Sequence, residues 1–229
     1  EIAVLKAANA VGARNVTLLP EPLLAALGAE MPIHTSSGNM IINMGGGTTE
    51  VAVISIDGVV EYESLRIAGD AINESIISDM RKKKGILIGE QTAEKIKIKI
   101  GSAMEVKDPR QMEVRGRDVG AGMPKSIMVD SNDIAKAVEW PLKNIIKSIQ
   151  AVLEKTPPEL SADIIDRGMV MSGGTALLRN LDKLFSRATG VPAHVADDPL
   201  FCVVKGTGIA LDLIETGERK FSFNRDFRR

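Results

Sequence analysis

The chain has 229 residues, 44% of them apolar, which is enough for a sizeable buried core and excludes a disordered chain. Its 29 basic and 30 acidic side chains leave a formal net charge of −1, and only 3% of the residues are aromatic, so no nucleic acid is expected as a main partner. A single cysteine and two histidines exclude an internal disulfide framework and a multi-histidine metal site, and no apolar run is long enough to span a bilayer.

The first 32 residues predict two helices around a short strand. Apolar side chains at helical spacing indicate a helix over 1–13, and a short apolar run indicates a strand over 15–19. Pro22 favours a helix over 21–27, because its missing N–H would be unpaired in a first helical turn anyway. Since residue 1 lies inside a predicted helix, we expect this chain to be a piece of a longer protein.

A glycine-rich turn joins the first two strands of a predicted meander. Strands are expected over 40–43, 50–56 and 59–65, in the pattern of three antiparallel neighbours. The glycines of the turn at 45–49 let the backbone approach a ligand closely and aim several N–H groups at one point, which suits a phosphate. From the spacing alone, an ordinary flexible hairpin is the alternative.

The helical period takes over from residue 69. A helix is predicted over 70–84, whereas the segment 93–100 fits both a helix and a strand. Glycine and proline interrupt the region 105–128, which predicts short antiparallel strands or loops. A long helix is predicted over 133–154, kinked at Pro141 and ended by the two prolines that follow it.

A second glycine turn follows a buried strand predicted over 169–171. The turn, Ser172-Gly173-Gly174-Thr175, precedes a helix predicted over 177–187. Helix N-termini that follow a strand are where α/β folds place ligands, although a tight connection is the commoner reason for two glycines. Two such turns in one chain are more informative than either alone.

The remaining elements complete an alternating pattern. A strand is predicted over 191–195 and a closing helix over 203–213, and a basic tail over 217–229 is expected to be poorly ordered. Strands that alternate with helices over most of the length indicate the α/β class.

Several segments carry a resemblance to a known family. They are Glu21-Pro-Leu-Leu-Ala-Ala-Leu-Gly28, Gly45-Gly-Gly-Thr-Thr-Glu-Val-Ala-Val53, Ala68-Gly-Asp70, Gly89-Glu-Gln-Thr-Ala-Glu-Lys95, Glu154-Lys-Thr-Pro-Pro-Glu-Leu160, Gly173-Gly-Thr-Ala-Leu-Leu178 and Lys205-Gly-Thr-Gly208. Together they resemble the MreB family, the bacterial actin homologues that determine rod shape. The glycine motifs are shared with actins, sugar kinases and heat-shock chaperones, whereas the segment 154–160 is more specific to MreB.

The resemblance implies an actin-like ATPase fold, built on ribonuclease H-like repeats in two lobes, with ATP in the cleft between them. This chain would hold the end of the first lobe (1–32, subdomain IA) and most of the second. The second lobe would divide into a larger subdomain IIA (33–68 and 129–215) and a smaller subdomain IIB (69–128), followed by a C-terminal tail (216–229). The segment 93–100, whose pattern fits both a helix and a strand, would then be a helix.

The same resemblance assigns residues to ATP. Contacts to the phosphates would come from Gly45, Gly46, Gly47, Thr48 and Thr49. Contacts to the adenosine would come from Gly173, Gly174, Thr175 and Ala176, with Glu94 and Lys97 facing the base or the ribose.

Three positions match residues that the family uses for hydrolysis and magnesium. Glu21 matches the glutamate that orients or activates the attacking water, and Thr48 matches the threonine that helps to position it. The alternative for Glu21 is a favourable charge at a helix N-terminus. Asn43 stands where the family commonly has the aspartate that helps to hold Mg²⁺, and an amide lacks its charge, so we expect weaker metal binding and slower turnover.

The resemblance implies a cytoskeletal ATPase of the cytoplasm. ATP would favour head-to-tail assembly into membrane-associated filaments that direct cell-wall synthesis and rod shape. Expected partners are copies of the protein itself, cell-wall synthesis proteins and membrane-anchoring proteins, with the membrane contacts mostly outside this chain. The alternatives are a nucleotide-binding scaffold with impaired hydrolysis, suggested by Asn43, and a chaperone or kinase of the same superfamily.

Overall fold

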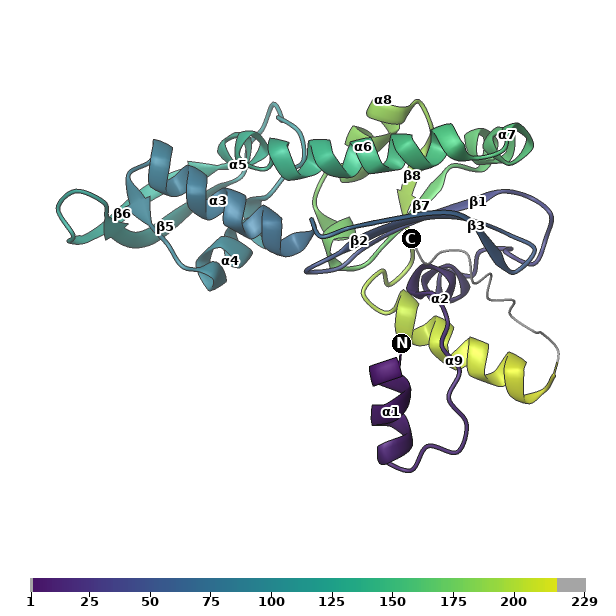
Figure 1. Ribbon diagram of the computed structural model, residues 1–229. Helices are drawn as coiled ribbons and strands as arrows, with labels where there is room; N and C mark the ends of the chain where they lie inside the picture. The colour runs from purple at the N-terminus through teal and green to yellow at the C-terminus, as the bar shows by residue number, and fades with distance from the viewer. Residues whose placement is uncertain (1, 218–229) are drawn as a thin grey trace.

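The computed structural model describes residues 2–217, and the remainder of the predicted tail lies outside the described residues. In chain order the elements are α1 (Ile2–Ala10), α2 (Glu21–Gly28), β1 (Asn39–Met44), β2 (Thr49–Ser55), β3 (Gly58–Leu65), α3 (Gly69–Lys83), β4 (Ile86–Leu87), α4 (Glu90–Ile100), β5 (Gln111–Asp118), β6 (Pro124–Asp130), α5 (Ser131–Ala137), α6 (Glu139–Lys155), α7 (Pro158–Arg167), β7 (Met169–Ser172), the 3₁₀ helix η1 (Gly174–Leu177), α8 (Leu181–Thr189), β8 (Ala193–Val195) and α9 (Cys202–Glu215). Figure 1 shows a larger part around β1, β2 and β7 and a smaller part that holds α3, α4, β5 and β6. The predicted α/β class is confirmed.

The larger sheet, ordered β3-β2-β1-β7-β8, joins the predicted meander to two parallel strands. β1, β2 and β3 pair antiparallel, and Asn43 faces Glu50 across the first of these ladders. β1 and β7 pair in parallel, with Asn43 opposite Ser172. Because parallel strands end at the same edge of a sheet, the two glycine turns that follow β1 and β7 come together there.

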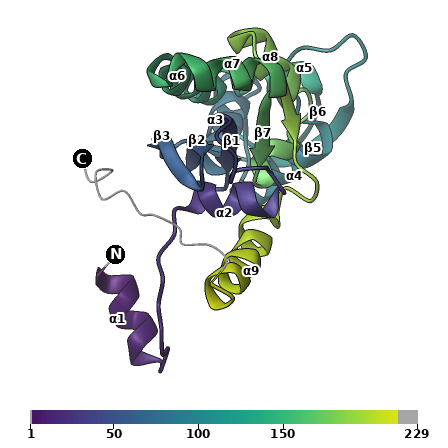
Figure 2. The same ribbon diagram turned by 90° about the vertical axis from the view of Figure 1, so that its right-hand side faces the viewer.

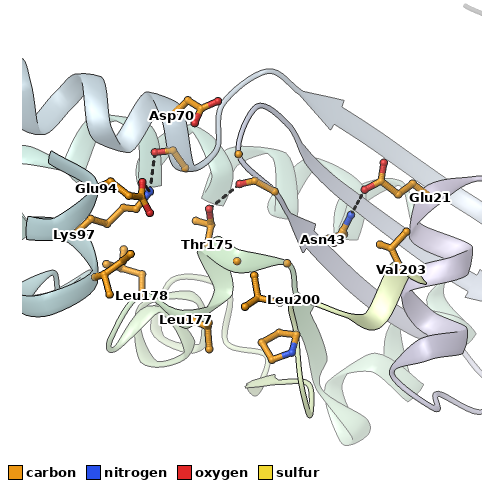
Figure 3. Close-up of a pocket in the computed structure, with 17 residues that line it drawn as sticks. Glu21, Asn43, Asp70, Glu94, Lys97, Thr175, Leu177, Leu178, Leu200 and Val203 are labelled. Carbon is orange, nitrogen blue, oxygen red and sulfur yellow. Dashed lines mark hydrogen bonds and ion pairs between the residues drawn. The ribbon is translucent and has the colours of Figure 1, made fainter. Parts of the chain in front are cut away.

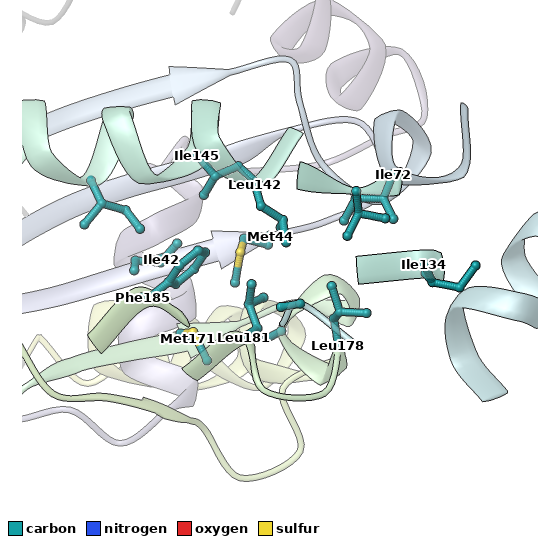
Figure 4. Close-up of a cluster of buried hydrophobic side chains, with 14 of the residues drawn as sticks. Ile42, Met44, Ile72, Ile134, Leu142, Ile145, Met171, Leu178, Leu181 and Phe185 are labelled. Atoms are coloured by element: carbon teal, nitrogen blue, oxygen red, sulfur yellow. The ribbon is translucent and has the colours of Figure 1, made fainter. Parts of the chain in front are cut away.

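Both faces of the larger sheet are buried, which explains why most positions of β1 and β2 are apolar. Met40, Ile42 and Met44 belong to the cluster on the face covered by α6, α7 and α8. Ile41 belongs to a second cluster, on the face covered by α2. Ile42 and Met44 lie in one cluster with Leu142 of α6 (Figure 4).

The smaller part packs α3, α4 and α5 on the antiparallel sheet β4-β5-β6. Its helix α4 resolves the ambiguous segment: Ile96 and Ile100 are buried, whereas Ile98, which a strand would place on the same face, is 69% exposed. Ile72 and Ile76 of α3 belong to the same apolar cluster as the core of the larger sheet. A continuous core therefore connects the two parts.

The first helix, α1, has no buried residue. It stands apart from the sheets in both views (Figures 1 and 2), and its Ile2 side chain is 71% exposed. The predicted helix is confirmed in type but ends at Ala10. None of the helices among residues 2–217 combines the length and the apolar composition of a membrane span.

The predicted strand over 15–19 is wrong. These residues have no strand assignment, and no described strand pairs with them. A strand is stable only when its backbone N–H and C=O groups find partners on a neighbouring strand, and the short apolar run does not provide such a neighbour.

The long helix predicted over 133–154 ends before the two prolines as expected, but it is not continuous. The helix predicted over 133–154 is two helices, because the backbone leaves the helical path at Val138, with φ −92° and ψ 5°. Pro141 therefore lies in the first turn of α6, where a missing N–H costs little, and not at a kink. Pro158 not only follows α6 but also opens α7, a helix that the periodicity does not predict.

The helix predicted over 177–187 begins four residues later than expected, at Leu181. The 3₁₀ helix η1 begins inside the glycine turn, at Gly174, and Asn180 then adopts a left-handed conformation with φ 60° before α8 starts. Asparagine tolerates that conformation better than most residues, so the chain changes direction there.

Helices α2 and α9 cross at two glycines below the larger sheet. A Cβ atom on Gly28 would lie 1.8 Å from the carbonyl oxygen of Cys202, and one on Gly206 would lie 1.8 Å from that of Leu24. These distances leave no room for any side chain, so the two backbones touch only because both residues are glycine.

We therefore expect Gly206→Ala to lower the free energy of unfolding by about 2 kcal/mol, because the two helices must separate. Gly208→Ala is the matched control in the same helix. Its new Cβ would meet no atom within 4 Å, and we expect it to raise stability by about 0.5 kcal/mol. Urea unfolding of both variants measures the difference, and equal effects would contradict the close contact.

Candidate functional site

A cleft of about 780 Å³ opens where the larger and smaller parts of the fold meet, a volume typical of small-molecule sites (Figure 3). It is lined by Glu21, Asn43, Gly45, Gly46, Gly69, Asp70, Glu94, Lys97, Ile98, Gly173, Gly174, Thr175, Leu177, Leu178, Pro199, Leu200 and Val203. In the close-up, Glu94 and Lys97 lie at one end, Glu21 and Asn43 at the other, and Thr175 between them.

The two glycine turns are bonded to each other in the middle of the cleft. The Thr175 hydroxyl donates to the carbonyl oxygen of Gly45 at 2.8 Å, and the backbone N–H of Gly69 donates to the same oxygen at 3.2 Å. The N–H of Asp70 donates to the carbonyl oxygen of Gly46 at 2.9 Å. The turn after β1, the start of α3 and the turn after β7 are thus held together by backbone groups.

The surroundings of Gly173 and of Gly45 differ, so packing requires glycine in only one of the two turns. Gly173 has φ +82°, and a Cβ on it would lie 2.2 Å from the carbonyl oxygen of Met44, so its side of the turn packs against the end of β1. A Cβ on Gly45 would meet only the carbonyl oxygen of Thr48, at 3.7 Å. Packing therefore does not require glycine at 45, and the space above this turn opens into the cleft.

An ionised pair closes one end of the cleft. The Lys97 Nζ lies 2.7 Å from the Glu94 carboxylate and donates to the carbonyl oxygen of Gly69 at 3.2 Å. Asn73 also donates to Glu94, at 2.7 Å. Burial alone would raise the pKa of Glu94, but the hydrogen bonds from Lys97 and Asn73 together lower it. Glu94 is therefore held as a carboxylate, and its bonds fix its position relative to Lys97.

Three side chains form a polar chain at the other end. Ser172 donates to the amide oxygen of Asn43 at 3.0 Å, and the amide nitrogen of Asn43 donates to Glu21 at 2.8 Å. Ser172 and Asn43 are buried, whereas Glu21 is exposed as the first residue of α2. The register of β1 and β7 creates this chain by setting Asn43 opposite Ser172.

A carboxylate that the sequence motifs leave without a role, Glu50, lies beside this polar chain. It faces Asn43 across the β1–β2 ladder, and its Oε1 accepts a hydrogen bond from the Tyr62 hydroxyl at 3.0 Å. Its Oε2 is buried and has no partner among the described residues. Burial raises the pKa of Glu50, the Tyr62 bond opposes that rise, and the charge of Glu21 adds to it.

Apolar side chains line the rest of the cleft, and the sequence motifs do not predict them. Leu177 and Leu200 are 55% and 61% exposed, and Ile98 of α4 belongs to the same lining. Exposed apolar residues are common on protein surfaces, so no pattern in the sequence distinguishes these from others. Gly69 and Asp70 belong to a segment that carries the family resemblance, but the sequence assigns them no role. The structure shows that both line the cleft.

The cleft brings together most of the predicted site residues. Those in its lining are Glu21, Asn43, Gly45, Gly46, Glu94, Lys97, Gly173, Gly174 and Thr175. Four predicted residues do not line it. Thr49 is buried and donates to the carbonyl oxygen of Ile67 at 2.7 Å, and Ala176 is buried in the core. Gly47 and Thr48 are exposed at the turn, and their contacts with phosphate or water stay predictions.

The described residues do not by themselves form a magnesium site. No group of three or more histidine, cysteine, aspartate or glutamate side chains among them is arranged to hold a metal. The amide oxygen of Asn43 already accepts from Ser172, and its nitrogen faces Glu21. Mg²⁺ in nucleotide sites is held largely by phosphate and water, so the protein side chains alone do not test such a site. The contact between Asn43 and magnesium therefore stays a prediction.

The chain is similar to proteins of one family along most of its length. A family model described as MreB/Mbl protein matches residues 1–219. The cell shape-determining protein MreB of Escherichia coli (strain K12) is 49% identical over 213 residues, which are 93% of this chain and 61% of that protein. The chain therefore spans less than two thirds of the length of this relative.

Solved structures agree on the fold. MreB 5 of Spiroplasma citri, in a crystal structure bound to AMPPNP, matches with a TM-score of 0.91 and 36% identity, over 95% of this chain and 65% of that one. A MamK double helical filament matches with a TM-score of 0.71 and 22% identity, over 93% of this chain and 64% of that one. The second likeness concerns the fold alone. Together they confirm the predicted actin-like fold.

The raised pKa of Glu50 makes a prediction about stability and pH. A carboxyl group whose pKa is raised by folding contributes stability at low pH that is lost as the pH rises through its folded value. As the pH rises from about 4 toward neutral, the wild type should therefore lose stability relative to Glu50→Gln, which cannot ionise.

Thermal unfolding of both proteins across this range measures the effect. Glu74→Gln, a change at an exposed glutamate of α3, is the control and should leave the pH dependence of the wild type unchanged. A difference between the wild type and Glu50→Gln that stays constant with pH would contradict the partial burial of Glu50.

Proposed function

Because this chain belongs to the MreB/Mbl family, we propose that it supplies most of the ATP-binding site of an actin-like cytoskeletal protein. The observation that carries the proposal is the meeting of two glycine turns on one cleft, joined by the bond from Thr175 to Gly45 at 2.8 Å. Open α/β sheets bind ligands at the carboxyl ends of their strands, where these turns lie. The AMPPNP bound in the related Spiroplasma citri structure supports the proposal that this chain binds a nucleotide.

The two ends of the cleft suit the two ends of ATP. The phosphates would lie over the turn at 45–49, where Gly45 leaves open space and backbone N–H groups of the turn would suit an anion. The adenosine would lie between the turn at 173–176 and the apolar side chains of the lining, with Glu94 and Lys97 facing the base or the ribose. Magnesium enters this proposal only as the counter-ion that the triphosphate carries.

Hydrolysis is assigned to Glu21 and Thr48. In phosphoryl transfer the protein mainly positions the nucleophile and neutralises charge. The Glu21 carboxylate at the edge of the cleft would orient the attacking water, and the Thr48 hydroxyl would help to hold that water. A scaffold with impaired hydrolysis is the second candidate, because the amide of Asn43 brings no negative charge toward magnesium.

The same assignment divides the chain between two lobes. Residues 1–32 would end the first lobe, 33–68 with 129–215 would form subdomain IIA, and 69–128 would form subdomain IIB. The lack of any buried residue in α1 supports this division, because a helix of the first lobe would pack on parts of that lobe.

At the level of the cell, we propose assembly into filaments that determine shape. The relatives are named cell shape-determining proteins, and the fold is shared with a MamK filament. These names favour a cytoskeletal protein over a chaperone or a kinase. The filaments would lie in the cytoplasm at the membrane and would bind membrane-anchoring and cell-wall synthesis proteins.

The turn at 45–49 can be tested with two matched glycines. Gly46→Ala would place a methyl group in the cleft, 3.4 Å from an Asp70 oxygen, and Gly120→Ala would place one 3.6 Å from an Asp118 oxygen in a distant turn. In the full-length gene product, we expect Gly46→Ala to weaken ATP binding about tenfold and Gly120→Ala to leave it unchanged. Isothermal titration measures both, and equal affinities would contradict the assignment.

Assembly can be tested by sedimentation of the full-length gene product with lipid vesicles. We expect ATP to increase the pelleted fraction, Gly46→Ala to reduce that increase, and Gly120→Ala to behave as the wild type. The reason is that head-to-tail contacts propagate when nucleotide fixes the lobes in one arrangement. The absence of any nucleotide-dependent polymer over a range of protein concentrations and lipids would contradict the proposal.

A further inference from the structure

We propose that Asn43 is a positioning residue for Glu21, which it holds at the edge of the cleft through an amide hydrogen bond. This inference rests on the proposed function, since it concerns the carboxylate assigned there to the attacking water. It gives the departure from the family's aspartate a physical role, because an ionised aspartate has no hydrogen to donate to Glu21.

Three elements contribute one side chain each to this arrangement. Ser172 ends β7, Asn43 lies near the end of β1, and Glu21 begins α2. The Ser172 hydroxyl lies 3.0 Å from the Asn43 Oδ1, and the Asn43 Nδ2 lies 2.8 Å from the Glu21 Oε1. Figure 3 shows the bond between Asn43 and Glu21 at the end of the cleft away from Lys97.

The orientation of the Asn43 amide follows from its two neighbours. A carboxylate accepts hydrogen bonds but cannot donate them, so the amide must present its nitrogen to Glu21. Its oxygen then faces Ser172, whose hydroxyl is able to donate. Ser172 is fully buried and Asn43 is 4% exposed, so water does not compete for the bond between these two residues as it does at the surface.

Glu21 needs such a partner. It is exposed at the start of a helix of eight residues, and no other hydrogen bond or ion pair is found for its carboxylate among residues 2–217. An exposed glutamate populates several rotamers, and fixing it costs side-chain entropy. A hydrogen bond from a buried amide offsets that entropy and fixes the carboxylate before the substrate arrives. A residue that orients water needs such a fixed position.

A role toward magnesium makes a different prediction. If Asn43 acted on the metal, its removal would slow turnover whether or not Glu21 were present. If Asn43 acts through Glu21, its removal matters only while Glu21 is there. A double-mutant cycle separates the two roles.

The test measures phosphate release by the full-length gene product with Asn43→Ala, Glu21→Ala and the double variant. We expect Asn43→Ala to lower kcat about tenfold and to change the KM for ATP less than about twofold. In the Glu21→Ala background, it should lower kcat by less than about twofold. An equal loss of kcat in both backgrounds would overturn the proposal.

Asn39→Ala is the matched control. Asn39 is also a buried amide on β1, 4% exposed, but it bonds to the carbonyl oxygen of Ser37 at 2.9 Å, away from the cleft. It should lower stability without changing kcat. Asn43→Asp should lower kcat, because the bond to Glu21 is lost, whereas a rise in kcat with a lower magnesium requirement would overturn the proposal.

A second readout does not depend on ATP. In thermal unfolding without nucleotide, the loss of melting temperature in the double variant should be smaller than the sum of the two single losses by about 2 °C, because the bond can be lost only once. Additive losses would overturn the contact. If the wild type releases no phosphate, the proposed hydrolysis fails, and this unfolding cycle still decides whether Asn43 holds Glu21.

Discussion

The parallel pairing of β1 with β7 is the constraint on which the rest of the site depends. It joins segments far apart in the sequence and sets Asn43 opposite Ser172. Because both strands end at one edge of the sheet, the turns that follow them share a cleft, and the Thr175 hydroxyl reaches the Gly45 carbonyl oxygen. A shift of one residue in this register would turn Asn43 to the opposite face and remove the polar chain to Glu21.

Backbone atoms, more than side chains, fix the shape of the cleft. A Cβ on Gly173 would lie 2.2 Å from the carbonyl oxygen of Met44, and one on Gly69 would lie 3.0 Å from the Thr175 hydroxyl. The start of α3 is bonded to the turn after β1 by the N–H groups of Gly69 and Asp70. The smaller part of the fold is therefore attached to the larger part at the place where a ligand would bind.

Local patterns in the sequence predicted the elements whose signals are local. The meander follows from apolar runs separated by turns. The local pattern leaves α4 ambiguous, and the family resemblance decides for a helix, which the buried Ile96 and the exposed Ile98 explain. The strand expected over 15–19 failed because strands need a partner that a local pattern does not contain. The bond from Asn43 to Glu21 and the partial burial of Glu50 depend on strand register and helix packing, so no spacing in the sequence could have predicted them.

If the two glycine turns form one nucleotide site, a single ATP molecule contacts both, and hydrogen exchange can detect those contacts. The backbone amides of residues 45–48 and 173–176 can be followed in the full-length gene product with and without ATP. We expect ATP to slow exchange in both turns together, with the same dependence on ATP concentration, because one ligand contacts both. Protection of only one turn, or of neither at saturating ATP, would contradict it.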